Sequence, residues 1–229
     1  TILASLAYGI PLSYDQVYCE GITRITAQDI EFASELGYKV KLLAITKLSG
    51  EEIEMRVHPT MVPNEYLISK VDGVFNAIYV EGDAVGSALF YGRGAGDLPT
   101  GSAVVADIVD IGKKILSGCA IARSSFWDGP AAAGKRIRKI DDIESKYYFR
   151  FSAMDEPGVL SKISGILGDN NISIASVIQK GRRIGGSVPL VVLTHRAREH
   201  GVIRAIQEID SLPVVSDRTV FIRVEGKEA

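Results

Sequence analysis

The chain has 229 residues, of which 46% are hydrophobic and 24% are charged, and its formal net charge is −2 at neutral pH. This composition is typical of a globular protein, and the length is enough for one large domain or two ordinary ones. The small negative charge argues against nucleic acid as a partner. Because no apolar run approaches the ~18 residues of a membrane-spanning helix, we expect no membrane partner.

The cysteines and histidines predict neither a disulfide framework nor a metal site. Cys19 and Cys119 are far apart in sequence, which suits the reducing cytoplasm and gives no metal-ligand spacing. The three histidines have no cysteine or carboxylate near them at the spacing of metal ligands. His58 precedes Pro59 at the end of a predicted strand, and we interpret it as structural rather than catalytic.

The beginning of the chain predicts two helices. Residues 2–7 have a helical pattern that Gly9 ends. The chain opens at Thr1 without an initiator methionine, from which we expect a fragment or a processed chain. The second helix should begin at Thr26, which forms a near capping box with Asp29. The apolar side of this helix is predicted at Ile30, Ala33 and Leu36.

Strands are predicted after these helices. Residues 38–47 are rich in apolar side chains, and the run 42–45 predicts burial on both faces. Residues 52–57 alternate between apolar and charged side chains, which predicts a strand with one buried face and with Arg56 pointing outward. Pro59 and Pro63 predict a loop after this strand.

Two further strands, residues 74–81 and 85–91, flank Gly82 and Asp83, which is the signal of a hairpin. Together these elements predict an α+β fold, in which helices pack on a mostly antiparallel sheet.

The segment 92–102, Gly-Arg-Gly-Ala-Gly-Asp-Leu-Pro-Thr-Gly-Ser, leads from the last of these strands into an amphipathic helix. Thr100 is placed to cap that helix. Backbone N–H groups and the helix dipole favour an anion or a cofactor phosphate at such a place. The dinucleotide fingerprint is not matched, because Asp97 stands where its third glycine belongs, and the lysine of a phosphate loop is missing. A tight turn without a ligand is the alternative.

The last third of the chain predicts the ferredoxin-like order βαββαβ. A sheet of this size leaves one face and some edges open, so we expect it to pair with a second copy. A turn is predicted at residues 181–186. The strands are predicted at 147–153, 172–179, 188–194 and 214–224, and the helices at 158–169 and 199–209.

The first strand and helix of this unit are joined by a short loop with two interpretations. Asp155 and Glu156 lie at the positive end of the helix, and Pro157 suits its first turn. Gly158 lets another backbone or a ligand approach closely. The loop is either a pocket for a small molecule, such as the carboxylate of an amino acid, or an ordinary helix cap.

The sequence Asp-Glu-Pro-Gly-Val-Leu at 155–160, followed by Asn-Asn-Ile-Ser-Ile at 170–174, resembles the ACT domain. That family is a βαββαβ regulatory module that binds amino acids between copies. The resemblance implies a homo-oligomer, a dimer or higher. It also implies a regulatory amino-acid site formed by Asp155, Gly158, Leu160, Asn171 and Ile172.

The first half of the chain resembles the catalytic region of homoserine dehydrogenase over nearly all of residues 1–116. The matching residues are Glu20-Gly-Ile22, Asp29-Ile30, Leu36-Gly-Tyr-Lys-Val-Lys-Leu-Leu-Ala44, Arg56-Val-His-Pro59, Gly73-Val-Phe-Asn-Ala-Ile78, Gly82-Asp83, Tyr91-Gly-Arg-Gly-Ala-Gly96, Pro99-Thr100 and Ala103-Val-Val-Ala-Asp-Ile108.

This resemblance implies an enzyme that uses NADP or NAD to interconvert L-aspartate 4-semialdehyde and L-homoserine in threonine and methionine biosynthesis. L-threonine is the implied feedback inhibitor. The family's N-terminal Rossmann domain is missing, and its catalytic lysine is expected upstream of Thr1, so no catalytic residue is assigned here. The implied cofactor contacts are Gly94, Ala95, Gly96 and Thr100.

We therefore predict a catalytic and dimerisation region at residues 1–130, a linker at 131–146 and an ACT domain at 147–229. The first hypothesis is a cytoplasmic, C-terminal fragment of homoserine dehydrogenase that is inactive alone. The alternative is a non-enzymatic, amino-acid-sensing ACT protein with a dimerisation domain.

Overall fold

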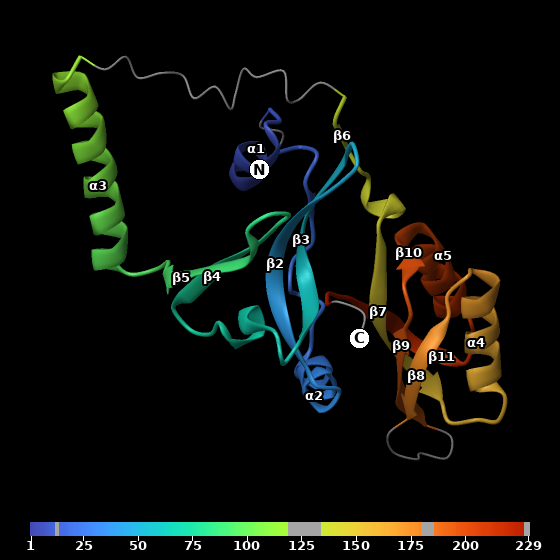
Figure 1. The fold of residues 1–229 in the computed structure, drawn as a ribbon. Helices are drawn as coiled ribbons and strands as arrows, with labels where there is room; N and C mark the ends of the chain where they lie inside the picture. The colour runs from blue at the N-terminus through green and yellow to red at the C-terminus, as the bar shows by residue number, and fades with distance from the viewer. Residues whose placement is uncertain (12–13, 119–133, 180–185, 227–229) are drawn as a thin grey trace.

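The computed structural model describes residues 1–11, 14–118, 134–179 and 186–226 (Figure 1). Cys119, most of the predicted turn at 181–186 and the first residues of the predicted linker lie outside these ranges. The described chain contains a nine-stranded sheet, a separate two-stranded sheet and helices that pack on them. The predicted α+β class is confirmed.

The first half of the chain begins with a short helix and contributes three strands to the large sheet. Helix α1 (Ile2–Tyr8) ends at Gly9, whose φ of 65° confirms the predicted stop. Strand β1 spans Tyr18–Cys19, β2 spans Tyr38–Ser49 and β3 spans Glu52–Pro63. Strands β2 and β3 are antiparallel along their whole length, while β1 runs parallel to β3.

Two predictions about these strands were wrong. Leu42 was expected in a segment buried on both faces, but it is 58% exposed, because exposed and half-buried side chains alternate along this part of β2. Pro59 and Pro63 were expected in a loop, but both lie in β3. On one edge of β3, the short ladder with β1 ends at Val57, and the short ladder with β11 begins at Thr60. Pro59 lies between these two ladders, so its missing N–H interrupts neither of them.

Helix α2 (Ala27–Glu35) begins at the predicted capping box. The Asp29 backbone N–H donates to Thr26 Oγ1 at 3.3 Å, and the Thr26 backbone N–H donates to Asp29 Oδ2 at 3.0 Å. The predicted apolar side was wrong at Ile30, which is 54% exposed. The prediction was right at Ala33, which is fully buried, and Leu36 packs against the same hydrophobic cluster. Asp29 and Phe32 are the other buried residues of this helix.

The predicted hairpin is confirmed by strands β4 (Phe75–Gly82) and β5 (Gly86–Arg93), which form the separate two-stranded sheet. A short 3₁₀ helix, η1 (Leu67–Lys70), precedes the hairpin, and the long helix α3 (Asp97–Leu116) follows it. In the described ranges no helix combines the length and the apolar composition needed to cross a membrane.

The second half of the chain confirms the predicted βαββαβ order. Its long strands are antiparallel in the order β11–β7–β9–β8, and two helices cover one face of them. The elements are β6 (Arg136–Ile137), η3 (Ile140–Asp142), β7 (Glu144–Met154), α4 (Val159–Asp169), β8 (Ile174–Gln179), β9 (Ser187–Thr194), β10 (Ala197–Arg198), α5 (Glu199–Asp210) and β11 (Val215–Val224).

One continuous sheet joins the two halves. Strand β11 runs antiparallel to β7, and its last residues pair in parallel with β3, where Arg223 lies opposite Thr60 and Val224 lies opposite Met61. Strand β6, inside the predicted linker, also pairs with β3. The sheet therefore runs without a break from β1 and β3 to β8 (Figure 1). The boundaries at residues 130 and 147 stay predictions.

Hydrophobic clusters cover both faces of the βαββαβ sheet. The larger cluster lies between the sheet and helices α4 and α5, and it contains Tyr147 and Phe149. Tyr148 points to the opposite face, because side chains alternate along a strand, and there it joins Phe32 and Ala33 of α2. Helix α2 thus covers part of the face that we expected a second copy to cover. Pairing with a second copy stays a prediction.

A buried ion pair fixes α2 on this face. Arg150 of β7 donates to the Asp29 carboxylate from Nε at 2.6 Å and from Nη2 at 3.2 Å, and Tyr148 Oη donates to it at 3.2 Å. Burial alone would raise the pKa of Asp29, but hydrogen bonds from Arg150 and Thr26 outweigh it and lower that pKa below its ordinary value.

Phe32→Ala should lower the free energy of unfolding by about 3–5 kcal/mol, the usual cost of removing a buried phenyl group. The ring packs against the sheet in the cluster that contains Met61 and Tyr148. Ile30→Ala on the same helix is the control, and it should change the free energy by less than about 0.5 kcal/mol, since Ile30 is exposed. Urea denaturation followed by circular dichroism measures both, and equal losses would contradict this orientation of α2.

The lowered pKa of Asp29 predicts a loss of stability in acid. The pKa of this carboxyl is 3.8 in the unfolded chain and lower in the folded one. Its ionised form therefore stabilises the fold when the pH is above the unfolded pKa, and this contribution is lost as the pH falls through the folded pKa. Asp29→Asn should therefore flatten the acid limb of a plot of unfolding free energy against pH below about pH 5. Asp110→Asn, at an exposed position of α3, is the control. A profile for Asp29→Asn that runs parallel to that of the wild type would contradict the assignment.

Candidate functional site

The glycine-rich loop Gly94–Gly96 connects the β4–β5 hairpin to helix α3. The Gly94 backbone N–H donates to Val74 O at 3.4 Å. A Cβ atom on Gly94 would lie 1.9 Å from Asn76 Nδ2 of β4, so a larger residue here would require the Asn76 side chain to move. The Asn76 side chain therefore packs closely against the backbone of the loop.

The N-terminus of α3 begins earlier than predicted. Gly96 is its N-cap, with a φ of 119° that favours glycine, and the helix starts at Asp97. Thr100 lies inside the helix, where its N–H donates to Gly96 O at 3.1 Å, so the prediction that Thr100 caps the helix was wrong. Gly94, Ala95, Gly96 and Thr100 are all exposed. The loop thus presents the backbone N–H groups of a helix N-terminus to solvent, an arrangement that favours anions.

The side chains around this loop are aromatic, basic and aliphatic. The rings of Phe75 and Tyr91 stack with centroids 4.8 Å apart, and the Arg93 guanidinium lies 5.6 Å from the Phe75 centroid. Within the described residues, α3 buries no side chain, and Figure 1 shows it standing apart from the large sheet. Its exposed apolar residues are Leu98, Val104, Val105, Ile108, Val109, Ile111, Ile115 and Leu116.

His58 has the surroundings of a structural histidine. Its ring is fully buried in β3, with Nδ1 3.0 Å from both Pro59 O and Thr60 Oγ1, and with Nε2 2.8 Å from Arg56 Nη1. Burial, together with the positive charges of Arg223 and Arg56, lowers the pKa of His58 to about 3. The imidazole is therefore neutral at physiological pH. Across the described residues, no three histidine, cysteine or acidic side chains gather in a way that could hold a metal ion.

The first group of predicted effector residues lies at the N-terminus of α4. Gln179 Nε2 of β8 donates to Asp155 Oδ1 at 3.1 Å. Gly158 is the N-cap, with a φ of 89°, and a Cβ there would meet nothing within 4 Å. Pro157 precedes this cap rather than lying in the first turn, and Leu160 is 43% exposed. The open space in front of Gly158 allows a small ligand to approach the backbone.

The second group, Asn171 and Ile172, lies at the other end of α4. Asn171 has a left-handed φ of 58°, and Ile172 is buried in the cluster beneath α4 and α5. Helix α4 has 11 residues, which span about 16 Å. The structure therefore does not bring the two groups together in one chain. A site that used both groups would need two copies.

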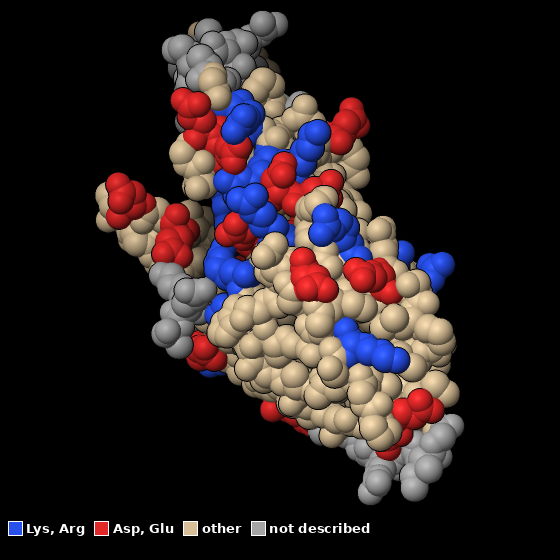
Figure 2. Space-filling model, turned by 90° about the vertical axis from the view of Figure 1, so that its right-hand side faces the viewer, with Lys and Arg blue, Asp and Glu red and all other residues tan. Residues whose placement is uncertain are grey.

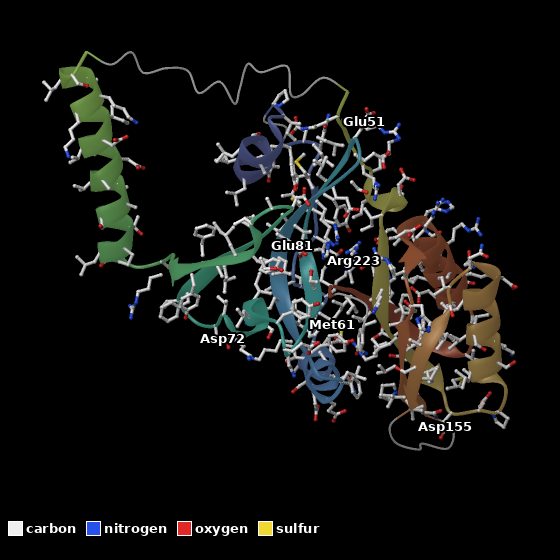
Figure 3. All side chains as sticks on the ribbon, in the orientation of Figure 1. Glu51, Met61, Asp72, Glu81, Asp155 and Arg223 are labelled. Carbon is white, nitrogen blue, oxygen red and sulfur yellow. The ribbon has the colours of Figure 1, made fainter. Side chains whose placement is uncertain are left out.

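The sequence patterns missed a buried ionic network where the two halves meet, close to Met61 (Figure 3). Arg223 of β11 is 1% exposed, and it pairs with Glu199 of α5 and, at 2.8 Å, with Glu20 Oε2 of the first half. Its guanidinium also lies 5.1 Å from the centroid of the Tyr18 ring. Burial alone would lower the pKa of Arg223, but Glu199 and Glu20 raise it above its ordinary value.

A second arm of the network involves Arg56, which was predicted to point outward but is 2% exposed. Arg56 Nη2 lies 2.7 Å from Glu225 Oε1 and 3.2 Å from Glu54 Oε2. Lys47 Nζ lies 2.7 Å from Glu225 Oε2. The alternation of β3 could not reveal this arrangement, because Arg56 and Glu225 are 169 positions apart in sequence. We call Glu20, Arg56, Glu199, Arg223 and Glu225 the junction network.

A groove of about 460 Å³ lies beside the junction network. Figure 2 views the molecule from the side, and basic and acidic side chains are intermixed over the upper part of the face drawn there. None of the residues predicted to bind a cofactor or an effector lines this groove, so its position does not support those predictions. Its lining includes Asp15, Cys19, Arg56, Arg138, Lys139 and Asp141.

Comparison with protein-family models finds homoserine dehydrogenase at residues 1–109 and the ACT domain at residues 147–213. Two curated relatives are the homoserine dehydrogenases of Neisseria gonorrhoeae and Pseudomonas aeruginosa. Each is 43% identical to this chain, over 99% and 98% of its length respectively. The chain spans about half the length of these relatives, 52% in both.

Solved structures agree with this result. A homoserine dehydrogenase from Thiobacillus denitrificans matches 98% of this chain and 51% of its own, with 41% identity and a TM-score of 0.86. The S. aureus homoserine dehydrogenase determined at pH 6.0 matches 99% of this chain and 52% of its own, with 26% identity and a TM-score of 0.64. The chain therefore belongs to the homoserine dehydrogenase family, and it carries the catalytic domain of that family followed by an ACT domain.

Proposed function

We propose that the chain is the catalytic-domain and regulatory part of an NAD(P)-dependent homoserine dehydrogenase, which interconverts L-aspartate 4-semialdehyde and L-homoserine. One observation carries the proposal. A homoserine dehydrogenase match at 1–109 and an ACT match at 147–213 occur in one chain, whose backbone follows a homoserine dehydrogenase structure over 98% of its length. A cytoplasmic place in threonine and methionine biosynthesis belongs to the same proposal.

Gly94, Ala95 and Gly96 are the residues to which we assign cofactor contact, with Thr100 beside them. Their exposure at the N-terminus of α3 supports the assignment, because a nicotinamide or a phosphate can approach a loop without large side chains. When bound, NADP or NAD supplies hydride chemistry. The chain would hold the loop in place through the hydrogen bond from the Gly94 N–H to Val74 O.

The exposed apolar face of α3 supports a longer enzyme. A 20-residue amphipathic helix gains most of its stability by packing its apolar face against other protein. The relatives are about twice as long as this chain, so they contain further protein that could cover α3. We assign no catalytic residue to this chain, and we keep the prediction that the catalytic lysine precedes Thr1.

The 229-residue chain should not oxidise NADPH in the presence of aspartate semialdehyde, because the family resemblance assigns the catalytic lysine and the Rossmann domain to residues outside these 229. The absorbance of NADPH reports the rate, and the full-length P. aeruginosa enzyme is the control. Turnover by the chain alone at the usual enzymatic scale of about 1 s⁻¹ or more would contradict the assignment.

L-threonine is the effector that we assign to the ACT domain. Asp155, Gly158 and Leu160 would contact it in one copy. Asn171 would contribute from a second copy, where its neighbour Ile172 is buried in the core. The positions of the two groups at opposite ends of α4 support a site shared between copies. The open space in front of Gly158 supports contact between the ligand carboxylate and the helix N-terminus.

Gly158→Leu should abolish calorimetric binding of L-threonine to the chain, because the new side chain would fill the space in front of α4. Gly73→Leu is a matched control, since Gly73 also has a left-handed φ, 66°, and a Cβ there also meets nothing within 4 Å. Each variant pays a backbone cost of about 1–2 kcal/mol, and thermal melts show whether the two costs are equal. Wild-type threonine affinity in a folded Gly158→Leu variant would show that the site lies elsewhere.

A further inference from the structure

Strand β11 reaches from the loop that contains Asp155 and Gly158 to the catalytic domain. Val214 is the residue just before β11. Its backbone oxygen accepts a hydrogen bond at 2.8 Å from the backbone N–H of Met154, which precedes Asp155 in the chain. At the other end of β11, Arg223 and Val224 pair with β3. Its 10 residues span about 33 Å. Figure 3 shows Asp155 and Arg223 well apart, the first at the lower end of the ACT domain and the second at the junction.

The two domains share the side chain of Arg223. Its Nε donates to Glu199 Oε2 at 3.0 Å, and Glu199 is the first residue of helix α5 in the ACT domain. Its Nη1 donates to Glu20 Oε2 at 2.8 Å in the catalytic domain. Because Arg223 is 1% exposed, water cannot easily replace a lost carboxylate. The fixed fork of the guanidinium makes both contacts sensitive to small shifts of β11 or α5.

The residue that follows β11 adds a contact of opposite polarity. Glu225 pairs with Arg56 and with Lys47, both at 2.7 Å and both in the catalytic domain. The end of the strand therefore carries one cation and one anion, each held by a partner across the junction. A slip of β11 by one residue would break both contacts, so these charges fix the position of the strand relative to β3.

On the basis of the threonine regulation proposed above, we propose that β11 transmits the effector state of the ACT domain to the catalytic domain, with Glu20 and Glu225 as the positioning residues. A ligand at Gly158 orders the loop that is hydrogen-bonded to the beginning of β11. Because β11 is paired with β7 along its length, a displacement of its first residues is passed along the strand to its last residues. At the junction the guanidiniums of Arg223 and Arg56 are buried, while the side chains of their partners Glu20 and Glu225 are 20% and 21% exposed. A buried guanidinium that lost its carboxylate would be unfavourable, so these pairs favour discrete arrangements over a gradual drift.

Hydrogen–deuterium exchange of the 229-residue chain with and without L-threonine tests this path. In the wild type, threonine should slow exchange at residues 154–160 and, by about fivefold or more, at residues 18–25. Glu20→Gln keeps the shape of the side chain and leaves Arg223 paired with Glu199. In this variant the slowing at 154–160 should persist, while the slowing at 18–25 should fall below about twofold. Glu225→Gln should give the same result.

Glu144→Gln is the matched control, because Glu144 pairs with Arg198 at an exposed site that does not cross the junction. It should keep both responses. The proposed transmission would be overturned if threonine slowed exchange at residues 18–25 fully in Glu20→Gln and Glu225→Gln, or if this slowing were lost in Glu144→Gln. Neither result would contradict the threonine site. If threonine does not bind the wild type, the proposed regulation fails, and the transmission fails with it.

Discussion

The parallel pairing of β11 with β3 is the interaction on which the arrangement of the two domains depends. Only two residue pairs form this ladder, so backbone hydrogen bonds alone would hold it weakly. Charged side chains make the arrangement specific. The buried Arg223 pairs with Glu199 of the ACT domain and with Glu20 across the junction. Glu225 pairs with Arg56 across the junction. A buried charge that loses its partner costs several kcal/mol, so the buried Arg56 and Arg223 disfavour other ways of docking the domains. The pairing of Asp29 with Arg150 adds a second contact of the same kind.

This arrangement separates the two proposed sites. The loop Gly94–Gly96 follows the two-stranded sheet, which shares no ladder with the large sheet among the described residues. The hairpin is instead tied to β2 through Asp72, which accepts hydrogen bonds from Lys39 at 3.2 Å and from Lys41 at 2.5 Å. An effect of the ACT domain on the loop would therefore pass from β11 through β3 and β2 to this exposed ion pair, or through further protein packed on α3.

Local patterns predicted local structure well. The alternation and helical spacing of the last third predicted βαββαβ, the capping box at Thr26 placed α2, and Gly82–Asp83 placed the hairpin. Failures arose where distant residues decide. Pro59 is tolerated in β3 because two different strands end and begin beside it, and Arg56 is buried because of a carboxylate 169 positions away. The glycine spacing correctly marked a loop at the N-terminus of a helix, but its assignment to a cofactor came from the family resemblance and not from the glycines. No local signal could reveal the junction network.

We expect β11 and the junction network to unite the catalytic and ACT domains into one cooperative unit. Differential scanning calorimetry of the 229-residue chain tests this most directly. The structure predicts a single unfolding transition whose calorimetric and van 't Hoff enthalpies agree. Two separate transitions, one for the ACT domain and one for the catalytic domain, would show that the shared sheet does not couple them.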